Sequence, residues 1–312
     1  MRAGSHALTA ALAVGLSVLI AGCGGAGQAA SANGKILAVG AETQYANVIE
    51  QIGGRYVQVS AVESNPNTDP HTFEASPSVA EAVAAAGLVV QNGAGYDEFM
   101  ERIEAASGGV QSNSHRKVID AQKLLGLPDS TRNPHLWYKP QTMPAIAQAI
   151  AADLAALQPA HAAYFKANAA AFERSLTPWY EALKQFATEY PGTAVATTEP
   201  VGDYMLEAAG TLNLTPFSLQ ADIMNGIDPA PQDVSTQNLL FAGHRVKAFV
   251  YNQQVTDSLT QSFLGAAKHA GVPVVGVYET MPTPGYDYQS WMLAEVRALR
   301  RAVAEGVSTE KL

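Results

Sequence analysis

The sequence contains a single cysteine, Cys23, among its 312 residues. Without a second cysteine the folded chain has no disulfide, and a metal site beyond this position must use nitrogen and oxygen ligands. Basic residues are also scarce, because 19 lysines and arginines stand against 28 acidic residues and the formal net charge is -9. Nucleic-acid binding depends on clustered basic side chains that neutralise phosphates, so we expect no nucleic-acid partner.

Two catalytic motifs are missing as well. The sequence has neither the H-E-x-x-H stretch of zinc proteases nor the G-x-S-x-G turn of serine hydrolases. The run Asn92-Gly93-Ala94-Gly95 hints at a nucleotide-binding loop, but Glu98 stands where the third glycine is required. These absences disfavour a hydrolase without excluding it, and we expect a binding protein and not an enzyme.

The N-terminus carries an apolar run from Ala7 to Ile20, which is too short for a comfortable membrane span of about 20 residues. Together with the preceding Arg2, this run predicts a signal peptide over residues 1–23. Residues 20–23, Ile-Ala-Gly-Cys, resemble a bacterial lipobox, which implies that Cys23 is lipidated and becomes the mature N-terminus. The alternative is an ordinary signal peptide with a chance cysteine. Residues 24–34 are rich in Gly, Ala and Ser and predict a flexible tether.

The rest of the chain has the length and, at 47% apolar residues overall, the hydrophobic content of two domains. Short apolar runs alternate with segments of helical spacing, which is typical of parallel sheets covered by helices. We predict an α/β fold of two lobes, each a parallel-sheet βα sandwich, with the ligand cleft between them. The expected divisions are an N-terminal lobe over 35–140, a helical connector over 141–190 and a C-terminal lobe over 191–312. The expected strands are 36–39, 56–62, 88–91, 117–119, 193–197, 248–251 and 272–277.

The connector contains helical spacing from Pro159 to Ala187, which predicts a helix of roughly 40 Å, long enough to span both lobes. Pro178 falls inside this helix and should kink or interrupt it, because proline removes a backbone hydrogen bond and clashes with the preceding turn.

Four side chains that can bind a metal lie in loops after expected strands, two in each lobe: His71, His135, Glu199 and Glu279. In open parallel sheets, ligands bind beyond the carboxyl ends of the strands, so these loops can meet in the cleft. Imidazole and carboxylate ligands suit Zn²⁺ and also Mn²⁺. A closed four-ligand site leaves little room for a reactive water, which favours transport over catalysis.

Each of these residues also has a simpler explanation. The two histidines stand in polar, proline-containing turns and could be surface residues or turn caps. Glu199 could stabilise a helix start, and Glu279 could be a solvated loop acid. Two neighbours are candidates for a supporting role. Asp69 could hold the His71 ring in its metal-binding tautomer, and Asn252 lies at the exit of strand 248–251 and so at the same sheet edge. The remaining histidines of the mature chain are expected at the surface: His115, His161, His244 and His269.

Several segments carry a resemblance to a known family. They are Asp69-Pro70-His71-Thr72-Phe73-Glu74, Asn133-Pro134-His135-Leu136-Trp137 and Thr197-Thr198-Glu199. With the lipobox and the long connecting helix, they resemble the zinc/manganese class of substrate-binding lipoproteins of bacterial ABC importers, the cluster A-I metal receptors. Val274 to Pro282 and Tyr251-Asn252-Gln253-Gln254 are similar to a branch of that family.

The resemblance implies that His71, His135, Glu199 and Glu279 are the metal ligands. The last position is more often Asp in the family, so Asp287 is the competing choice. Many zinc-specific members carry a His-rich loop, and this sequence has none. Zinc has the higher intrinsic affinity for most nitrogen and oxygen sites, whereas two carboxylates favour manganese; we expect zinc.

The resemblance further implies how the protein works. It would be a lipid-anchored monomer at the outer face of the cytoplasmic membrane or in the periplasm, where it captures Zn²⁺ or Mn²⁺ and delivers the ion to an ABC permease. Two other functions stay open. A metal-dependent hydrolase on the same fold would need an open metal position and a nearby general base, and in an adhesin-like anchored lipoprotein the histidines would be incidental.

Overall fold

The protein is an α/β structure with two parallel sheets. The computed structural model describes residues 34–65, 73, 76–106, 116–282 and 285–312, together with Met1. Both sheets have four strands, and their orders are β2-β1-β3-β4 and β6-β5-β7-β8. Every strand pair within them is parallel. The expected α/β fold of two parallel-sheet lobes is therefore confirmed.

The first sheet and its helices form the N-terminal lobe. Its strands β1, β2, β3 and β4 cover Ile36–Glu42, Val57–Glu63, Leu88–Gln91 and Lys117–Asp120. Its helices α1, α2, α3 and α5 cover Thr43–Gly53, Pro77–Ala85, Glu98–Ala106 and Ala121–Leu124. All residues of β3 are buried, whereas β2 at the sheet edge alternates between buried and exposed positions. Strand β3 lies inside the sheet, where helices cover both of its faces, whereas β2 lies at the edge.

The second sheet and its helices form the C-terminal lobe. Its strands β5, β6, β7 and β8 cover Ala194–Thr197, Leu212–Asn213, Ala248–Asn252 and Val274–Val277. Its helices α9 to α13 cover Asp203–Ala208, Phe217–Met224, Pro231–Ala242, Ser258–His269 and Tyr288–Glu305. The inner strand β7 and the edge strand β8 are both buried throughout.

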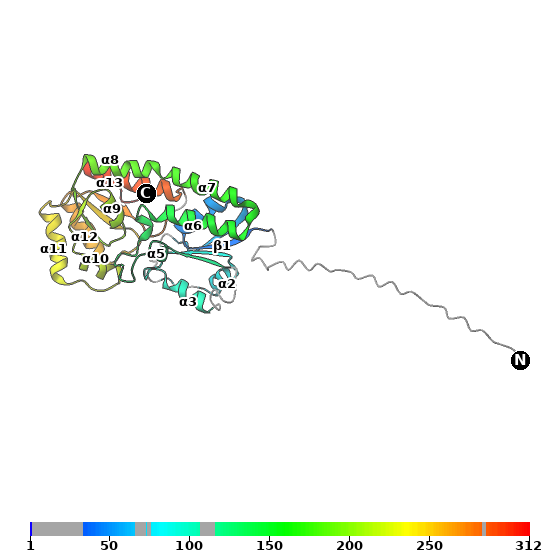
Figure 1. The fold of residues 1–312 in the computed structure, drawn as a ribbon. Coiled ribbons are helices and arrows are strands. Elements are labelled where there is room, and N and C mark those ends of the chain that lie inside the picture. The colour runs from blue at the N-terminus through cyan, green and yellow to red at the C-terminus, as the bar shows by residue number, and fades with distance from the viewer. Residues whose placement is uncertain (2–33, 66–72, 74–75, 107–115, 283–284) are drawn as a thin grey trace.

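The connector between the lobes is helical, and its helices run along one side of both lobes (Figure 1). Helix α6 (Thr142–Leu157) is followed by the short turn η4 (Pro159–His161), α7 (Ala162–Ser175) and α8 (Thr177–Glu189). The expected long helix is thus interrupted between α7 and α8. Pro178 lies in the first turn of α8, where a proline needs no backbone N–H partner. The predicted interruption is confirmed.

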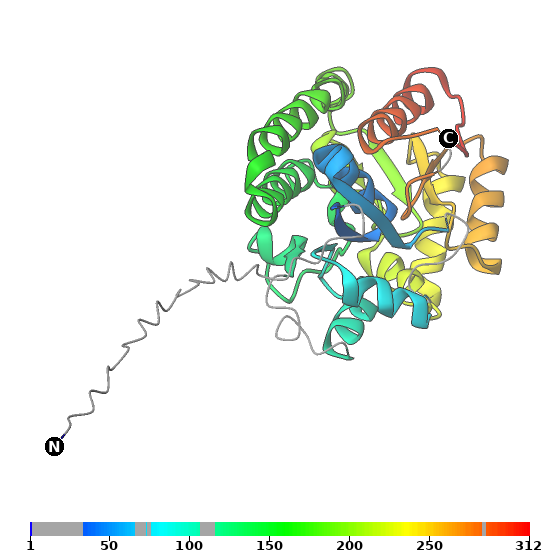
Figure 2. The ribbon, with the colours of Figure 1, turned by 90° about the vertical axis from the view of Figure 1, so that its right-hand side faces the viewer.

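The connector helices divide their contacts between the lobes. Helix α7 packs on α1 of the N-terminal lobe, and α8 packs on α13 of the C-terminal lobe. Figure 2 views the molecule from the side of the N-terminal lobe, with the green connector helices flanking the blue β1. One continuous hydrophobic cluster joins side chains of both lobes through these helices, including Val90, Phe172, Val250 and Trp291. The two lobes therefore share one hydrophobic cluster on the side of the connector helices.

Several short elements were not expected from the sequence. They are α5, β6, α10 and the turn η3 (Leu136–Tyr138). Strand β6 is only two residues long, and α5 only four, so neither has room for a hydrophobic period. Within the described ranges, no helix is both long and apolar enough to span a membrane.

Candidate metal centre

His135 lies on the loop between the first sheet and α6, at the start of η3, and is fully buried. Its ring Nδ1 is 2.8 Å from the side-chain oxygen of Asn133, which also accepts from the His135 backbone N–H at 3.0 Å. The Asn133 amide nitrogen donates to the carbonyl of Pro200 at 2.7 Å, and this bond fixes which end of the amide faces the ring. Because an amide oxygen only accepts, Nδ1 must carry the hydrogen. The lone pair of the neutral ring is then on Nε2.

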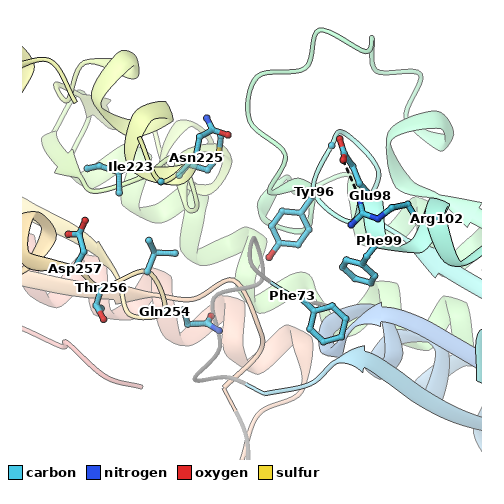
Figure 3. Close-up of a pocket in the computed structure, with 14 residues that line it drawn as sticks. Phe73, Tyr96, Glu98, Phe99, Arg102, Ile223, Asn225, Gln254, Thr256 and Asp257 are labelled. Atoms are coloured by element: carbon cyan, nitrogen blue, oxygen red, sulfur yellow. Dashed lines mark ion pairs between the residues drawn. The ribbon is translucent and has the colours of Figure 1, made fainter. Parts of the chain in front are cut away.

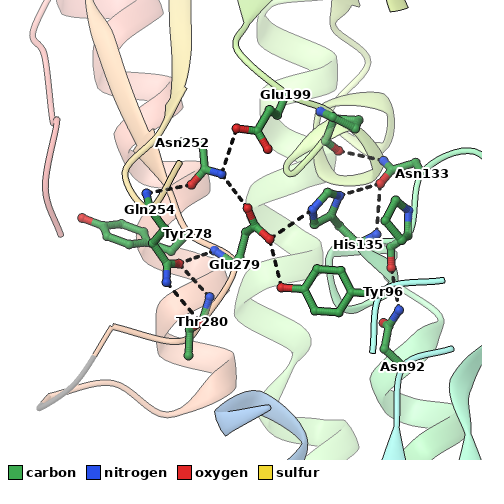
Figure 4. A network of polar contacts seen from close by, with 12 residues as sticks. Asn92, Tyr96, Asn133, His135, Glu199, Asn252, Gln254, Tyr278, Glu279 and Thr280 are labelled. Carbon is green, nitrogen blue, oxygen red and sulfur yellow. Dashed lines mark hydrogen bonds and ion pairs between the residues drawn. The ribbon is translucent and has the colours of Figure 1, made fainter. Parts of the chain in front are cut away.

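Glu279 lies just beyond β8, and its carboxylate is also fully buried. Its Oε2 is 3.6 Å from Nε2 of His135 and accepts a hydrogen bond of 2.9 Å from the Tyr96 hydroxyl. Its Oε1 accepts from the Asn252 amide at 2.7 Å. The imidazole of one lobe and the carboxylate of the other therefore meet across the interface (Figure 4).

Glu199 follows β5 and is 2% exposed. Its Oε1 is 3.3 Å from the Asn252 amide nitrogen, which also donates to Glu279. One amide group thus contacts both carboxylates of the C-terminal lobe. Asn252 in turn is held by its backbone N–H, which donates to the Thr198 hydroxyl at 3.0 Å.

The backbone of Glu279 is fixed by residues from both lobes. The Gln254 side-chain oxygen accepts from the N–H groups of Glu279 and Thr280 at 2.6 and 2.8 Å. From the N-terminal lobe, the Gln44 amide donates to the Glu279 carbonyl at 3.1 Å. The Thr280 hydroxyl donates to Glu63 at 2.7 Å, again across the interface. These contacts from both lobes fix the position of the Glu279 loop.

Further carboxyl groups surround this network. Glu42 and Glu63 end the paired strands β1 and β2 and are directly opposite each other in the sheet register. Burial raises the pKa of Glu63 to about 7. Burial also raises the pKa of Glu42 well above its usual value, and the nearby carboxylates of Asp97, Glu63 and Glu279 add to the effect. Neither carboxyl oxygen of Glu42 has a hydrogen-bond partner in the described part of the chain. A cation near these groups would relieve their mutual repulsion.

A cavity of about 610 Å³ lies between the lobes beside the network (Figure 3). The N-terminal lobe lines it with Phe73, Tyr96 and Phe99, and the C-terminal lobe with Ile223 and Gln254, among others. Tyr96 and Gln254 belong to both the cavity wall and the polar network. Burial, followed by Glu279, raises the pKa of Tyr96 well above 10, so its hydroxyl stays a donor. The cavity therefore adjoins the polar network.

Comparison with known proteins decides the family. The family model described as "Zinc-uptake complex component A periplasmic" matches residues 39–302. The chain belongs to the ZnuA family. It is 27% identical over 159 residues to the manganese-binding lipoprotein MntA of Bacillus subtilis strain 168, a match that covers 50% of this chain and 52% of that one. It is 21% identical over 236 residues to the manganese ABC transporter substrate-binding lipoprotein PsaA of Streptococcus pneumoniae, covering 72% and 74%. The chain thus spans about half of the length of the B. subtilis relative.

Solved structures agree on the fold. A crystal structure of ZnuA superposes with a TM-score of 0.70 at 23% identity, covering 86% of this chain and 100% of that one. A manganese-bound periplasmic metal-binding protein from Candidatus Liberibacter asiaticus gives a TM-score of 0.68 at 17% identity, with the same coverage. At these identities the likeness establishes that this ZnuA-family chain has the two-lobed fold of both structures.

The sequence-based site residues fall into two groups in this family member. His135, Glu199, Glu279 and Asn252 lie within one polar network. The other three residues, His71, Asp69 and Cys23, lie outside the described residues. Among the described side chains, no three His, Cys, Asp or Glu residues are close enough together to hold a metal ion. A metal site here therefore depends on closer approach of its ligands or on further ones.

The competing fourth ligand, Asp287, has a different task. Its carboxylate accepts from the Ser290 N–H at 2.8 Å and from the Ser290 hydroxyl, and so caps the start of α13. Among the other histidines, His244 and His269 are exposed as expected, whereas His161 is half-buried and stacks on Tyr56 with ring centroids 3.8 Å apart. His115 lies outside the described residues.

The sequence interpretation missed several residues of the site. Asn133, Tyr96, Gln254 and Glu42 all contact or surround the candidate ligands. Only Asn133 leaves a local signal, because an Asn two residues before His135 can form a turn with its side-chain oxygen on the following backbone. The others come from distant parts of the chain.

Proposed function

We propose that this chain is an extracytoplasmic substrate-binding protein that captures a divalent transition-metal ion, Zn²⁺ or Mn²⁺, for an ABC-type importer. The main support is the pairing of His135 and Glu279 across the lobe interface. The imidazole is held in the tautomer that leaves Nε2 with a lone pair, and this atom is 3.6 Å from a carboxylate oxygen. A cation bound by both groups would join the two lobes.

The proposed ligands are His71, His135, Glu199 and Glu279. Glu279 is preferred over Asp287, because the latter is already engaged as a helix cap. A set of two imidazoles and two carboxylates suits both Zn²⁺ and Mn²⁺. A divalent cation beside the buried carboxyl groups would lower their raised pKa values and stabilise their ionised forms, which favours a cation over neutral solutes.

Delivery and location are part of the same proposal. Relatives named as lipoproteins of metal ABC transporters support a permease partner at the membrane. Lipidation of Cys23 would keep the protein, as a monomer, near that permease. Changing Cys23→Ser should release the chain from the membrane fraction, and retention of the variant in that fraction would contradict the anchor.

Metal binding is tested with the purified chain by titration of Mn²⁺ and Zn²⁺ against a competing chelator. The wild-type chain should bind about one ion and gain roughly 4 kcal/mol of stability at a thousandfold excess over its dissociation constant. His135→Ala should lose this gain. His269→Gln is the matched control, because His269 is exposed at the end of α12. Equal binding by both variants would contradict the proposal.

The same titration ranks the two metals. Zn²⁺ should displace Mn²⁺ from the purified chain, because most nitrogen and oxygen sites bind zinc more tightly. A site that holds Mn²⁺ against equimolar Zn²⁺ would need a larger ligand number than the four proposed residues supply.

A further inference from the structure

Glu295 is a fully buried acid on the inner face of α13, away from the proposed ligands. Its Oε1 is 2.8 Å from the Tyr138 hydroxyl and 2.7 Å from the indole nitrogen of Trp291. Tyr138 belongs to η3, the turn that begins directly after His135. Glu295 therefore contacts, through one hydroxyl, the segment that carries the histidine.

The same hydroxyl also contacts the segment that carries the carboxylate. The Tyr138 oxygen is 2.9 Å from the Tyr278 carbonyl and 3.3 Å from the Tyr278 backbone nitrogen. Tyr278 directly precedes Glu279 in the chain. A second bond from α13 supports η3, since the Tyr288 hydroxyl donates to the Trp137 carbonyl at 2.6 Å. Tyr138 thus joins the two loops whose side chains meet in the site.

The number of hydrogens decides the protonation state of Glu295. The Tyr138 hydroxyl has one hydrogen, and its neighbours include two oxygens, the Tyr278 carbonyl and Glu295 Oε1. A carbonyl and an ionised carboxylate both only accept, so Tyr138 could satisfy one of them but not both. A neutral Glu295 supplies its own hydrogen to Tyr138, and Tyr138 is then free to donate to Tyr278.

Burial agrees with this count. It raises the pKa of Glu295 to about 8, although the hydrogen bonds from Tyr138 and Trp291 lower it in part. The second carboxyl oxygen, Oε2, has no hydrogen-bond partner among the residues that the structure describes, which suits a neutral acid better than an ion. The titratable groups that face Glu295 are tyrosines from three places: Tyr138 of η3, Tyr278 after β8 and Tyr288 of α13.

We propose that Glu295 is a positioning residue: as a neutral acid it keeps the Tyr138 hydroxyl bonded to the Tyr278 carbonyl, and so keeps His135 and Glu279 at the spacing needed to bind the ion. When Glu295 is ionised, the Tyr138 hydroxyl donates its hydrogen bond to Glu295 instead. The hydrogen bond from Tyr138 to the Tyr278 carbonyl is then lost. Metal affinity therefore falls as pH rises and Glu295 ionises. This inference rests on the proposed metal-binding function.

The test compares the purified full chain with Glu295→Gln at pH 7 and pH 9, using Mn²⁺ against a competing chelator. With its amide nitrogen at the position of Oε1, glutamine can donate to Tyr138, although it loses the bond from Trp291, and it cannot ionise. With a pKa of about 8, about ten in eleven Glu295 side chains are ionised at pH 9, and the apparent dissociation constant of the wild type should rise about tenfold relative to the variant. Taking the ratio of the two proteins cancels effects of pH on the metal and on other groups.

Two further variants separate this role from a general loss of structure. Tyr138→Phe removes the link at every pH, so its dissociation constant should exceed that of the wild type at pH 7 and keep a constant ratio to that of Glu295→Gln. Glu305→Gln lies on the same helix but is exposed, and it should follow the wild type. A wild-type to Glu295→Gln ratio that stays constant between pH 7 and pH 9 would overturn the inference.

The ionisation can also be followed without metal. Trp291 donates to Glu295, so its fluorescence should change near pH 8 in the wild type and stay constant in Glu295→Gln. If the chain binds no metal but this change is present, the proposed function fails while the protonation state of Glu295 is upheld. If metal binds but the fluorescence difference is absent, the inference fails and the proposed function stands.

Discussion

The two sheets have the same strand order but use equivalent strand ends differently. In the N-terminal lobe, the first strand, β1, ends with the carboxyl group of Glu42, and Asn92 follows the third strand, β3. In the C-terminal lobe, Glu199 follows β5, and Asn252 ends β7. Each lobe thus offers a carboxylate and an amide at the same edge of its sheet.

The difference lies in what these amides contact. Asn252 donates to Glu199 and Glu279, so the C-terminal amide serves the carboxylates. Asn92 donates to the Pro134 carbonyl and accepts from Tyr45, so the N-terminal amide serves the loop before His135. Asn92 and Asn252 thus occupy equivalent positions in the two sheets but contact different groups. The N-terminal amide supports the loop of the imidazole, and the C-terminal amide supports the carboxylates.

The largest effect is expected at Glu279. Glu279→Gln should raise the dissociation constant for Mn²⁺ by about a hundredfold or more, above the 10- to 100-fold that loss of an outer partner costs. Asp287→Ala should leave metal affinity unchanged but reduce the free energy of unfolding by about 1 kcal/mol, because it removes a helix cap. Chelator competition and chemical unfolding measure the two quantities. The reverse pattern would make Asp287 the ligand.

Asn133 tests how the N-terminal lobe holds its imidazole. Asn133→Ala removes the acceptor that fixes the His135 tautomer, so metal affinity should fall about 10- to 100-fold. The loss should be larger than that in Asn92→Ala, which acts on the loop and not on the ring. An Asn133→Ala chain with wild-type affinity would show that the ring is positioned by packing alone.

The architecture and the candidate ligands could both be predicted from the sequence, because both depend on local patterns. Buried strands such as Leu88–Gln91 and Val274–Val277 are short apolar runs with clear ends. Three of the predicted site residues, His135, Glu199 and Glu279, follow strands and lie in one network.

The supporting residues could not be predicted, since their partners are distant in the chain. The Tyr96–Glu279 bond joins residues 183 positions apart, and the Tyr138–Glu295 bond joins residues 157 apart. Nothing in the local sequence distinguishes these side chains from ordinary core or surface residues. From the sequence alone, a buried acid such as Glu295 cannot be told from the other charged residues of an amphipathic helix.

The two equivalent carboxylates should respond differently to neutralisation. Glu199→Gln should weaken metal binding, whereas Glu42→Gln should stabilise the metal-free chain at alkaline pH. The pKa of Glu42 is raised in the folded state, so its contribution to stability is present below its unfolded value of 4.5 and is lost as pH rises through the folded value. Chemical unfolding between pH 5 and pH 9 should show a growing advantage of Glu42→Gln. An advantage that is constant over this range would contradict the raised pKa.

The smallest effect is expected in the overall shape. The lobes share a hydrophobic core through the connector helices, which should restrict hinge opening. Solution scattering of the metal-free and metal-loaded chain should give nearly equal radii of gyration. A large decrease on loading would mean that the lobes close as separate bodies.

The central claim is that one ion binds to an imidazole of the N-terminal lobe and a carboxylate of the C-terminal lobe. Anomalous diffraction from crystals of the chain grown with Mn²⁺ or Zn²⁺ tests it most directly. We predict a single strong peak within about 2.0–2.3 Å of both His135 Nε2 and a Glu279 oxygen. A peak elsewhere, with these two side chains still in contact only with protein atoms, would contradict the account.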